Sequence, residues 1–333
     1  MRWPETRRDK GYIPVAQSKV ITFHPQPDRS ACAVELRGVH KRYDHFVAVD
    51  HLYVSIREGS VYGLLGPNGA GKTSTIRMMI GITMPDDGHV RLFGEPFHRR
   101  QLRRIGYMPE ERGLYKRMKV LDHLILLGRL HDLTERDARD RAMKWCERLK
   151  IASWTHNKVE ELSKGMQQKV QFIATLLHDP DLVIMDEPFS GLDPANAVML
   201  KDVLIDLKKA GKTILFSTHR MDQVERLCDS ICLIDHGRAI LEGDLKKIKA
   251  SYGKNHVQIE CEGDPHLENC DLVQSVNNYG NYVEVQLKPG ADAQRLLRVA
   301  ADRVRISRFE LLEPSLEEIF IDQVGKHQVS KHA

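Results

Sequence analysis

The chain has 333 residues, of which 41% are hydrophobic and 29% are charged. This balance is typical of a folded globular protein and excludes a chain that is disordered throughout. The length predicts two domains, at about 150 residues each. No apolar run approaches the roughly 18 residues of a membrane-spanning helix. If the protein works at a membrane, we expect another chain to supply the spanning helices.

The net charge of +4 comes from 50 basic and 46 acidic residues. Residues 1–30 contribute +3, from six Lys or Arg and three acids, so residues 31–333 carry only +1. With a net charge this close to zero, residues 31–333 lack the broad basic surface of a general nucleic-acid binder. We therefore expect no nucleic-acid partner. The six cysteines are scattered without paired metal-ligand spacing, which predicts free or structural thiols in a reducing, cytosolic setting.

Residues 1–30 hold four prolines and mixed charge, without the apolar segment of about 7–15 residues that a secretory signal needs. We predict a disordered N-terminal extension there. From residue 31 to about residue 250, short apolar strands alternate with helical patterns, which predicts an α/β domain with a doubly wound sheet. Strands are expected at residues 34–36, 60–64, 182–185, 213–217 and 230–234.

Two further regions differ from this pattern. Between about residues 114 and 180 the periodicity is helical, and we predict a helical subdomain with helices at 121–130, 135–149 and 165–178. After residue 250 the pattern changes again, which predicts a small α+β accessory domain over residues 251–333. Its strands are expected at 256–261, 282–287 and 304–311, and its helices at 291–302 and 316–324.

A phosphate-binding loop follows the predicted strand that ends near residue 65. The run Gly66-Pro67-Asn68-Gly69-Ala70-Gly71-Lys72-Thr73 matches the eight-residue motif at every fixed position and opens a predicted helix. Lys72 is expected at the β- and γ-phosphates, and the Thr73 hydroxyl at Mg²⁺. Ser74, the next residue, is also counted among the predicted nucleotide contacts. ATP and Mg²⁺ are therefore the expected cofactors.

Two acids end the apolar strand at residues 182–185. Because a buried strand delivers its last side chains to the carboxyl edge of the sheet, Asp186 and Glu187 are expected beside the phosphate loop. We predict that Asp186 holds Mg²⁺ and that Glu187 is the general base for the attacking water. Two acids before a turn would not by themselves indicate catalysis, but the upstream phosphate loop favours it.

These motifs belong to a longer series. The run Leu162-Ser163-Lys164-Gly165-Met166-Gln167-Gln168 is similar to the signature of ATP-binding-cassette (ABC) proteins, and Ser190-Gly191-Leu192-Asp193 and His219 follow in the family's order. Over residues 32–247 the chain resembles an ABC transporter nucleotide-binding subunit. The resemblance implies the P-loop NTPase fold of an ABC cassette and an ATPase activity that energises a separate permease.

The resemblance also implies roles for single residues. Tyr43 matches the aromatic residue that stacks on adenine, and His219 matches the switch histidine at the γ-phosphate. Asp193 matches the acid at the dimer seam. Ser163 and Gly165 would cap the nucleotide of a second subunit, either an identical chain or a paralogue.

Other segments narrow the resemblance. Residues 105–115, the signature variant and residues 313–320 are similar to a bacterial branch that pairs with ABC-2-type permeases and is linked to export of sodium, drugs or similar solutes. This implies integral membrane partners at the cytoplasmic face of the cell membrane. Glu110 replaces the family's linker glutamine, and we count it among the nucleotide and metal contacts with Thr73 and Asp186. Lys164 and Met166 also depart from the usual signature.

Two other functions remain possible from the sequence. A soluble ABC ATPase of translation or DNA repair usually has two cassettes, a long coiled coil or zinc modules, and the sequence predicts none of these. A cassette-shaped binding protein without turnover would not need Lys72, Asp186, Glu187 and His219 together. The basic run Arg99, Arg100, Arg103 and Arg104 could face anionic lipid, but a solvated face is favoured.

Overall fold

The computed structural model describes residues 21–22, 32–253, 255–288 and 290–329. Within these residues, the central element is a seven-stranded sheet with the order β1-β11-β10-β4-β9-β8-β7. Strands β10, β4, β9, β8 and β7 run parallel to one another, and β11 is antiparallel to β10. The strands are β1 (Ile21–Thr22), β4 (Val61–Leu65), β7 (Ile105–Met108), β8 (Leu182–Asp186), β9 (Thr213–Thr218), β10 (Ser230–Asp235) and β11 (Arg238–Asp244).

The predicted disordered extension, residues 1–30, lies outside the described residues except for Ile21–Thr22. These two residues form β1 and pair in parallel with Leu241 and Glu242 of β11. This short part of the extension is therefore a strand, because the outer edge of β11 offers main-chain groups that an extended segment can pair with.

The central sheet is buried on both faces, as the continuous apolar runs of its parallel strands require. In β8, Val183 and Met185 lie in one core and Leu182 and Ile184 lie in the other. This alternation follows from the two-residue period of a strand. The sheet therefore separates two layers, and it ends in an edge where side chains of β8 and β9 reach the phosphate loop.

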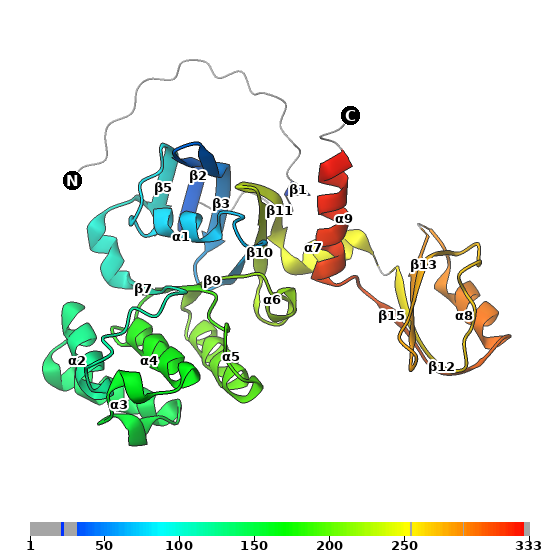
Figure 1. The fold of residues 1–333 in the computed structure, drawn as a ribbon. Helices are drawn as coiled ribbons and strands as arrows, with labels where there is room; N and C mark the ends of the chain where they lie inside the picture. Colours follow the sequence, from blue (N-terminus) through cyan, green and yellow to red (C-terminus); the bar gives the residue numbers. More distant parts are fainter. Residues whose placement is uncertain (1–20, 23–31, 254, 289, 330–333) are drawn as a thin grey trace, which may run out of the picture.

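An antiparallel sheet with the order β3-β2-β5-β6 and the helix α1 (Lys72–Met79) form the first layer (Figure 1). The strands are β2 (Cys32–Tyr43), β3 (Phe46–Arg57), β5 (Asp87–Leu92) and β6 (Glu95–Pro96). The sequence predicted only residues 34–36 of this sheet. The rest of the β2–β3 hairpin was not predicted, although the buried Leu52, Val54 and Ile56 of β3 alternate with more exposed residues.

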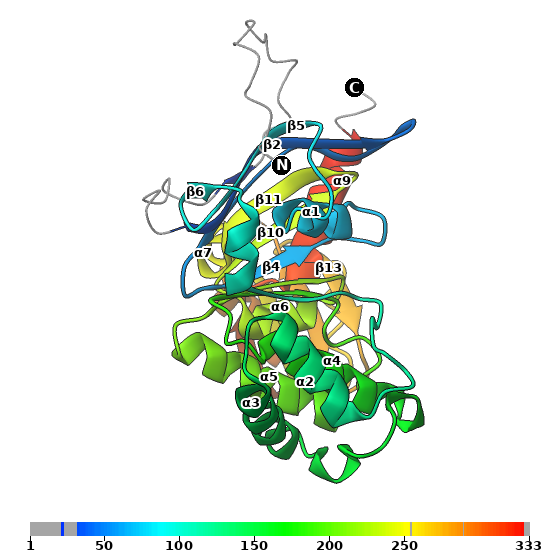
Figure 2. The same cartoon turned by 90° about the vertical axis from the view of Figure 1, so that its left-hand side faces the viewer.

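Helices form the second layer, on the opposite face of the central sheet (Figure 2). They are α2 (Val120–Leu130), α3 (Glu135–Arg148), α4 (Lys164–Leu176), α5 (Pro194–Lys209) and α6 (Met221–Leu227). The helices predicted between residues 114 and 180 correspond to α2, α3 and α4, with ends that differ by no more than two residues. Among the described residues, no helix is both long enough and apolar enough to cross a membrane.

The basic run forms a short 3₁₀ helix at Arg99–Arg104. The Arg103 guanidinium lies 3.3 Å from the Asp132 carboxylate, and the Arg104 guanidinium lies 2.6 Å from that of Asp181. Two of the four arginines are therefore paired with acids of this chain, which supports the solvated-face interpretation.

After α7 (Leu245–Tyr252), a second antiparallel sheet has the order β13-β14-β12-β15. Its strands are β12 (His256–Glu262), β13 (Val273–Asn278), β14 (Val283–Leu287) and β15 (Arg305–Leu312), and α8 (Ala293–Ala301) packs on it around a small core of its own. The strand β13 was not predicted. It is an edge strand in which only Val273 is fully buried, so its sequence lacks an apolar alternation.

The last helix, α9 (Leu316–Val329), leaves this small domain and returns to the cassette (Figure 1). Leu316 and Ile319 are buried in the cassette core. The Leu316 main-chain N–H donates to the Glu225 carboxylate of α6, which also lies 3.5 Å from the Lys249 ammonium of α7. The predicted domain boundary at residue 250 assigns α9 to the accessory domain. The structure instead buries the start of this helix in the cassette core.

Candidate active site

The phosphate loop joins β4 to α1, and two of its glycines make contacts that a side chain would prevent. A Cβ at Gly66 would lie 2.2 Å from the Ile234 carbonyl oxygen, and a Cβ at Gly71 would lie 2.3 Å from that of Ala48. Gly71 also has φ 106°, in the left-handed region that glycine favours. The loop can therefore lie close against the neighbouring main chain.

Lys72 is buried inside this loop, with 7% of its surface exposed. Its ammonium donates to the carbonyl oxygens of Gly66 at 2.7 Å and Pro67 at 3.0 Å. Burial lowers the pKa of Lys72, and the negative charges of Glu187, Asp186 and Glu110 act against that shift. The cation therefore bonds the carbonyl oxygens of its own loop and lies within electrostatic reach of three acids.

The carboxylate of Asp186 is held by two hydroxyl groups. Thr73 Oγ1 donates to Asp186 Oδ2 at 2.7 Å, and the Ser217 hydroxyl donates to Asp186 Oδ1. The parallel register of β8 and β9, in which Asp186 lies opposite Ser217, creates the second contact. Hydroxyl and carboxylate oxygens are the donors that Mg²⁺ prefers, so Thr73 and Asp186 fit the predicted metal site.

Glu187 follows directly and is 8% exposed. Its Oε1 accepts from the His219 main-chain N–H at 3.1 Å and lies 2.9 Å from His219 Nδ1, while Oε2 accepts from Thr218 Oγ1 at 3.1 Å. Glu187 has φ 51°, which costs a non-glycine residue on the order of 1–3 kcal/mol. A strained, buried carboxylate with a histidine partner is typical of a catalytic site.

Glu110 lies in the loop after β7, where its side chain is exposed. Its charge acts on the pKa of two neighbouring groups, the buried Lys72 and the partly buried Tyr107. It opposes the lowering of the Lys72 pKa, and it contributes, after burial and Asp186, to raising the pKa of Tyr107 to about 12. Glu110 therefore belongs to the electrostatic environment of the phosphate loop.

The predicted adenine contact, Tyr43, ends β2 and pairs with Phe46 across the hairpin. Both rings are exposed, Tyr43 by 41% and Phe46 by 60%. The Lys41 ammonium lies 5.5 Å from the Tyr43 ring centroid. An exposed aromatic face thus lies at the tip of the β2–β3 hairpin in the antiparallel sheet, whereas the phosphate loop follows β4 of the central sheet. Ser74 lies half-buried in the first turn of α1.

The remaining predicted site residues gather at two neighbouring helix starts. Ser163 is the N-cap of α4, and its Oγ accepts from the Met166 N–H at 3.3 Å. Asp193 is the N-cap of α5 and accepts from the Asn196 main-chain N–H at 2.9 Å. A Cβ at Gly165 would lie 3.6 Å from Asn196 Nδ2.

This second cluster belongs to the helical layer, whereas α1 lies on the other side of the central sheet (Figure 1). The structure therefore brings Lys72, Thr73, Asp186, Glu187 and His219 together. It places Ser163, Gly165 and Asp193 elsewhere.

No sequence motif pointed to the hydroxyls of Ser217 and Thr218, which bond Asp186 and Glu187. Their signal is their place at the end of a buried strand, directly before His219. A strand parallel to the one that carries the acids must end at the same edge of the sheet.

The contacts of two glutamines on α4 were likewise not predicted. Gln171 Nε2 donates to the carbonyl oxygens of Pro109 at 2.7 Å and Glu111 at 3.3 Å, and Gln168 Nε2 donates to Pro188 O at 2.9 Å. The signature helix therefore holds both the linker after β7 and the loop after Glu187. Their i, i+3 spacing places the two glutamines on one face of the helix.

Comparison with known proteins agrees with this geometry. The ABC transporter family pattern matches residues 49–190, and that of the DrrA1-3-like ATP-binding protein C-terminal domain matches residues 243–324. The chain is 43% identical to the uncharacterized ABC transporter ATP-binding protein YhaQ of Bacillus subtilis over 288 residues, 86% of this chain and 97% of that protein. It is 39% identical to the Nod factor export ATP-binding protein I of Cupriavidus metallidurans over 254 residues, 75% of this chain and 78% of that protein.

Solved structures show the same fold. An ATP-binding subunit of an ABC transporter matches with a TM-score of 0.61 and 30% identity, over 66% of this chain and 93% of that one. The cbiO1 protein of Clostridium perfringens, described as part of the ABC transporter complex cbiONQ, matches with a TM-score of 0.59 and 26% identity, over 66% and 91%. The predicted cassette fold is confirmed, and the chain is an ATP-hydrolysing subunit of the ABC transporter family with a DrrA-like C-terminal domain.

Proposed function

We propose that Glu187 is the general base of ATP hydrolysis and that His219 couples it to the γ-phosphate. The contact between Glu187 Oε1 and His219 Nδ1, at 2.9 Å, is the observation that supports this proposal. In the described arrangement both carboxylate oxygens accept hydrogen bonds, from His219 and Thr218. When the γ-phosphate attracts the half-exposed His219 ring, Oε1 becomes available to accept a proton from water.

The other residues orient the nucleotide. Lys72 and the main-chain N–H groups of the loop bind the β- and γ-phosphates, and Tyr43 stacks on adenine. Thr73 and Asp186 would hold Mg²⁺, which supplies positive charge to the phosphate oxygens when bound. Glu110 adds a carboxylate beside this group. The ordered Thr73–Asp186 contact means that the donor oxygens are positioned by the protein itself.

The helix-start cluster serves a second subunit. Ser163 and the first turn of α4 offer a hydroxyl and a positive dipole end, which suit a γ-phosphate. Because this cluster and the phosphate loop lie in different layers, we propose that two chains close head to tail, each capping the other's ATP. Gly165 permits close approach, and Asp193 lies at the seam. An identical chain or a paralogue would fit this arrangement.

The permease contact would be the linker at residues 110–115. Through Gln171 and Gln168, α4 connects this linker to the loop after Glu187, so the linker would move with the hydrolytic site. We propose a complex of two such chains with two integral membrane subunits of the ABC-2 type, at the cytoplasmic face of the membrane. Export is the direction that the Nod factor export relative suggests.

The test is purification of the tagged full chain from detergent-solubilised membranes of its native host. An integral membrane protein should co-purify. Arg112→Ala should weaken its recovery without changing ATP affinity, whereas Arg117→Ala, which changes an exposed arginine just after the linker, should leave recovery unchanged. Recovery with ribosomes or DNA and no membrane protein would reject the transporter proposal in favour of a role in translation or repair.

A further inference from the structure

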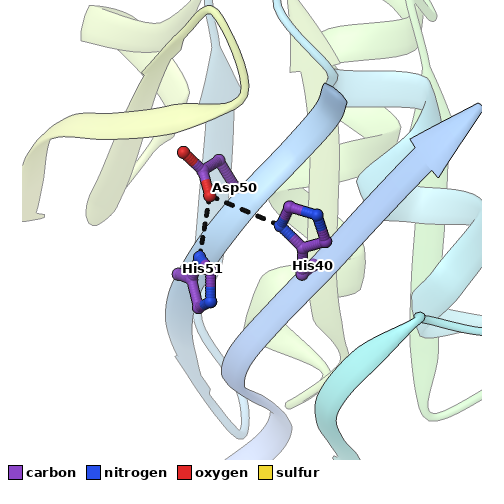
Figure 3. Close-up of side chains that lie close together, drawn as sticks. All are labelled: His40, Asp50 and His51. Carbon is purple, nitrogen blue, oxygen red and sulfur yellow. Dashed lines mark hydrogen bonds and ion pairs between the residues drawn. The ribbon is translucent and has the colours of Figure 1, made fainter. Parts of the chain in front are cut away.

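Two histidines and one aspartate meet on the outer sheet, away from the catalytic acids. His40 comes from β2, and Asp50 and His51 come from β3 (Figure 3). Asp50 Oδ1 lies 2.7 Å from His51 Nδ1 and 3.3 Å from His40 Nδ1. One ligand atom from each of the three side chains lies within 4.8 Å of the others.

The register of the β2–β3 hairpin creates this cluster. Val39 pairs with Leu52, and Lys41 pairs with Val49. Between these pairs β2 has one residue, His40, and β3 has two, Asp50 and His51. This is a β-bulge, which changes the direction of side chains and can bring neighbours in sequence to the same side of a sheet. His51 has φ 49°, the left-handed conformation that turns it toward Asp50.

Neighbouring groups orient the aspartate. Arg238 Nε donates to Asp50 Oδ2 at 2.6 Å, so Oδ1 is the oxygen that faces both imidazoles. Burial works to raise the pKa of Asp50, but hydrogen bonds from His51 and Arg238 lower it below its usual range. The carboxylate is therefore anionic at neutral pH. The hydrogen bond from Arg238 to Asp50 Oδ2 is the kind of supporting contact that orients metal-ligating carboxylates.

The histidine on β2 supplies the strongest sign of an unused donor. His40 Nδ1 is buried, and within the described part of the chain it has no hydrogen-bond partner; its contact with Asp50 is an ion-pair distance. A buried nitrogen without a partner costs about 1–3 kcal/mol. A ligand that accepts its lone pair would remove this cost.

We propose that His40, Asp50 and His51 bind a divalent transition-metal ion of the Zn²⁺ class, with water completing the coordination. Two imidazoles and one carboxylate form a three-ligand set that suits zinc and its neighbours. Magnesium prefers oxygen ligands, so this site differs in chemistry from the one at Thr73 and Asp186. Each imidazole would bind the ion through Nδ1 as the neutral tautomer with its one proton on Nε2, and a proton that an imidazolium ring carries on Nδ1 would be released to solvent.

The site lies close to the phosphate loop through the main chain. The Asp50 N–H donates to Gly237 O at 2.8 Å, and the Gly237 N–H donates to Ala70 O at 2.9 Å. Tyr43 lies three residues after His40 on β2. Metal binding is therefore best measured without nucleotide or Mg²⁺, so that the readout does not depend on ATPase activity.

The experiment uses the full chain with a tag that contains no histidine, freed of metal by a chelator. Co²⁺ is titrated and followed by its visible absorption, and Zn²⁺ is titrated by calorimetry. We expect one saturable equivalent that His40→Ala weakens by at least about tenfold, the scale of losing a group that supports a metal site. His51→Asn should weaken it likewise, and Asn tolerates the left-handed backbone at that position.

The matched control is His45→Ala, which removes an exposed histidine from the turn of the same hairpin and should leave the affinity unchanged. Circular dichroism checks that each variant is folded. Absence of saturable binding in the parent chain would overturn the proposal. So would equal affinity in the parent chain and both ligand variants, because the metal would then be held elsewhere.

Discussion

Glu187 Oε1 accepts a hydrogen bond from the main-chain N–H of His219 at 3.1 Å and lies 2.9 Å from the Nδ1 atom of the same residue. Glu187 is buried at the end of one strand, while the His219 side chain is half-exposed just after the neighbouring strand. The pair therefore joins an enclosed carboxylate to a ring that can respond to a bound phosphate. In the proposed mechanism, this relationship would connect nucleotide recognition with activation of water.

Glu187→Gln should bind ATP but hydrolyse it roughly 10²–10⁴-fold more slowly, because the amide cannot accept the proton that general-base catalysis removes. An ATP-bound dimer should then persist in gel filtration with ATP and Mg²⁺. Glu147→Gln, on an exposed face of α3, is the control and should hydrolyse ATP normally. Turnover of Glu187→Gln near the parental rate would show that another group is the base.

Ser163→Arg should abolish turnover and leave ATP binding by the single chain intact, because Ser163 lies at the start of α4 in the other layer from the phosphate loop. Fluorescence titration with a nucleotide analogue measures the binding. Mixing this variant with Lys72→Ala should restore low activity, since one composite site keeps both an intact loop and an intact cap. Loss of nucleotide binding by the Ser163→Arg monomer would contradict the two-chain arrangement.

Gln171→Ala should loosen the linker, since two main-chain carbonyls, those of Pro109 and Glu111, lose their donor. A hydrogen bond contributes about 1 kcal/mol, so amide exchange around residues 110–115 should accelerate by about fivefold. Hydrogen-exchange mass spectrometry resolves this region. The control is Gln167→Ala: its side chain donates to Val159 and Leu162, so any acceleration should occur around residues 159–162 instead. Unchanged exchange in the linker of Gln171→Ala would rule out its role as a support.

Glu242 should make stability depend on pH. Its side chain is buried on β11, and burial raises its pKa to about 7 although hydrogen bonds from Tyr62 and Ser55 act to lower it. Between the ordinary pKa of 4.5 and 7, the folded state keeps a proton that the unfolded state loses, so the free energy of unfolding falls as pH rises. The stability that the neutral acid contributes below pH 4.5 is lost above about pH 7, by at most roughly 3 kcal/mol.

Glu242→Gln should therefore stabilise the protein at pH 8.5 and have little effect at pH 4.5, because the amide imitates the neutral acid and cannot ionise. Urea unfolding at both pH values measures the difference. Glu262→Gln, a more exposed acid at the end of β12, is the control. Equal stability of the Glu242→Gln and parent proteins at pH 8.5 would mean that the charge is tolerated without cost.

Local sequence was sufficient to predict the functional groups that lie next to one another in the chain. The glycines of residues 66–71, Lys72 and Thr73 form one turn and the start of one helix, so their spacing predicts a phosphate loop without knowledge of the fold. Asp186 and Glu187 follow a run of apolar residues that only a buried strand explains. The three helices between residues 114 and 180 were predicted because helical periodicity is a property of neighbouring residues.

Contacts between distant segments depended on tertiary structure. Asp186 meets Ser217 through the register of two parallel strands, and α9 joins the cassette core through Leu316 and Ile319. Likewise, His40 meets Asp50 and His51 because of one bulge in a hairpin. A register shift of a single residue would turn these side chains to the other face, and no short sequence pattern specifies it. The sequence by itself therefore determined which chemical groups the protein carries, and packing of the sheets decided which of them meet.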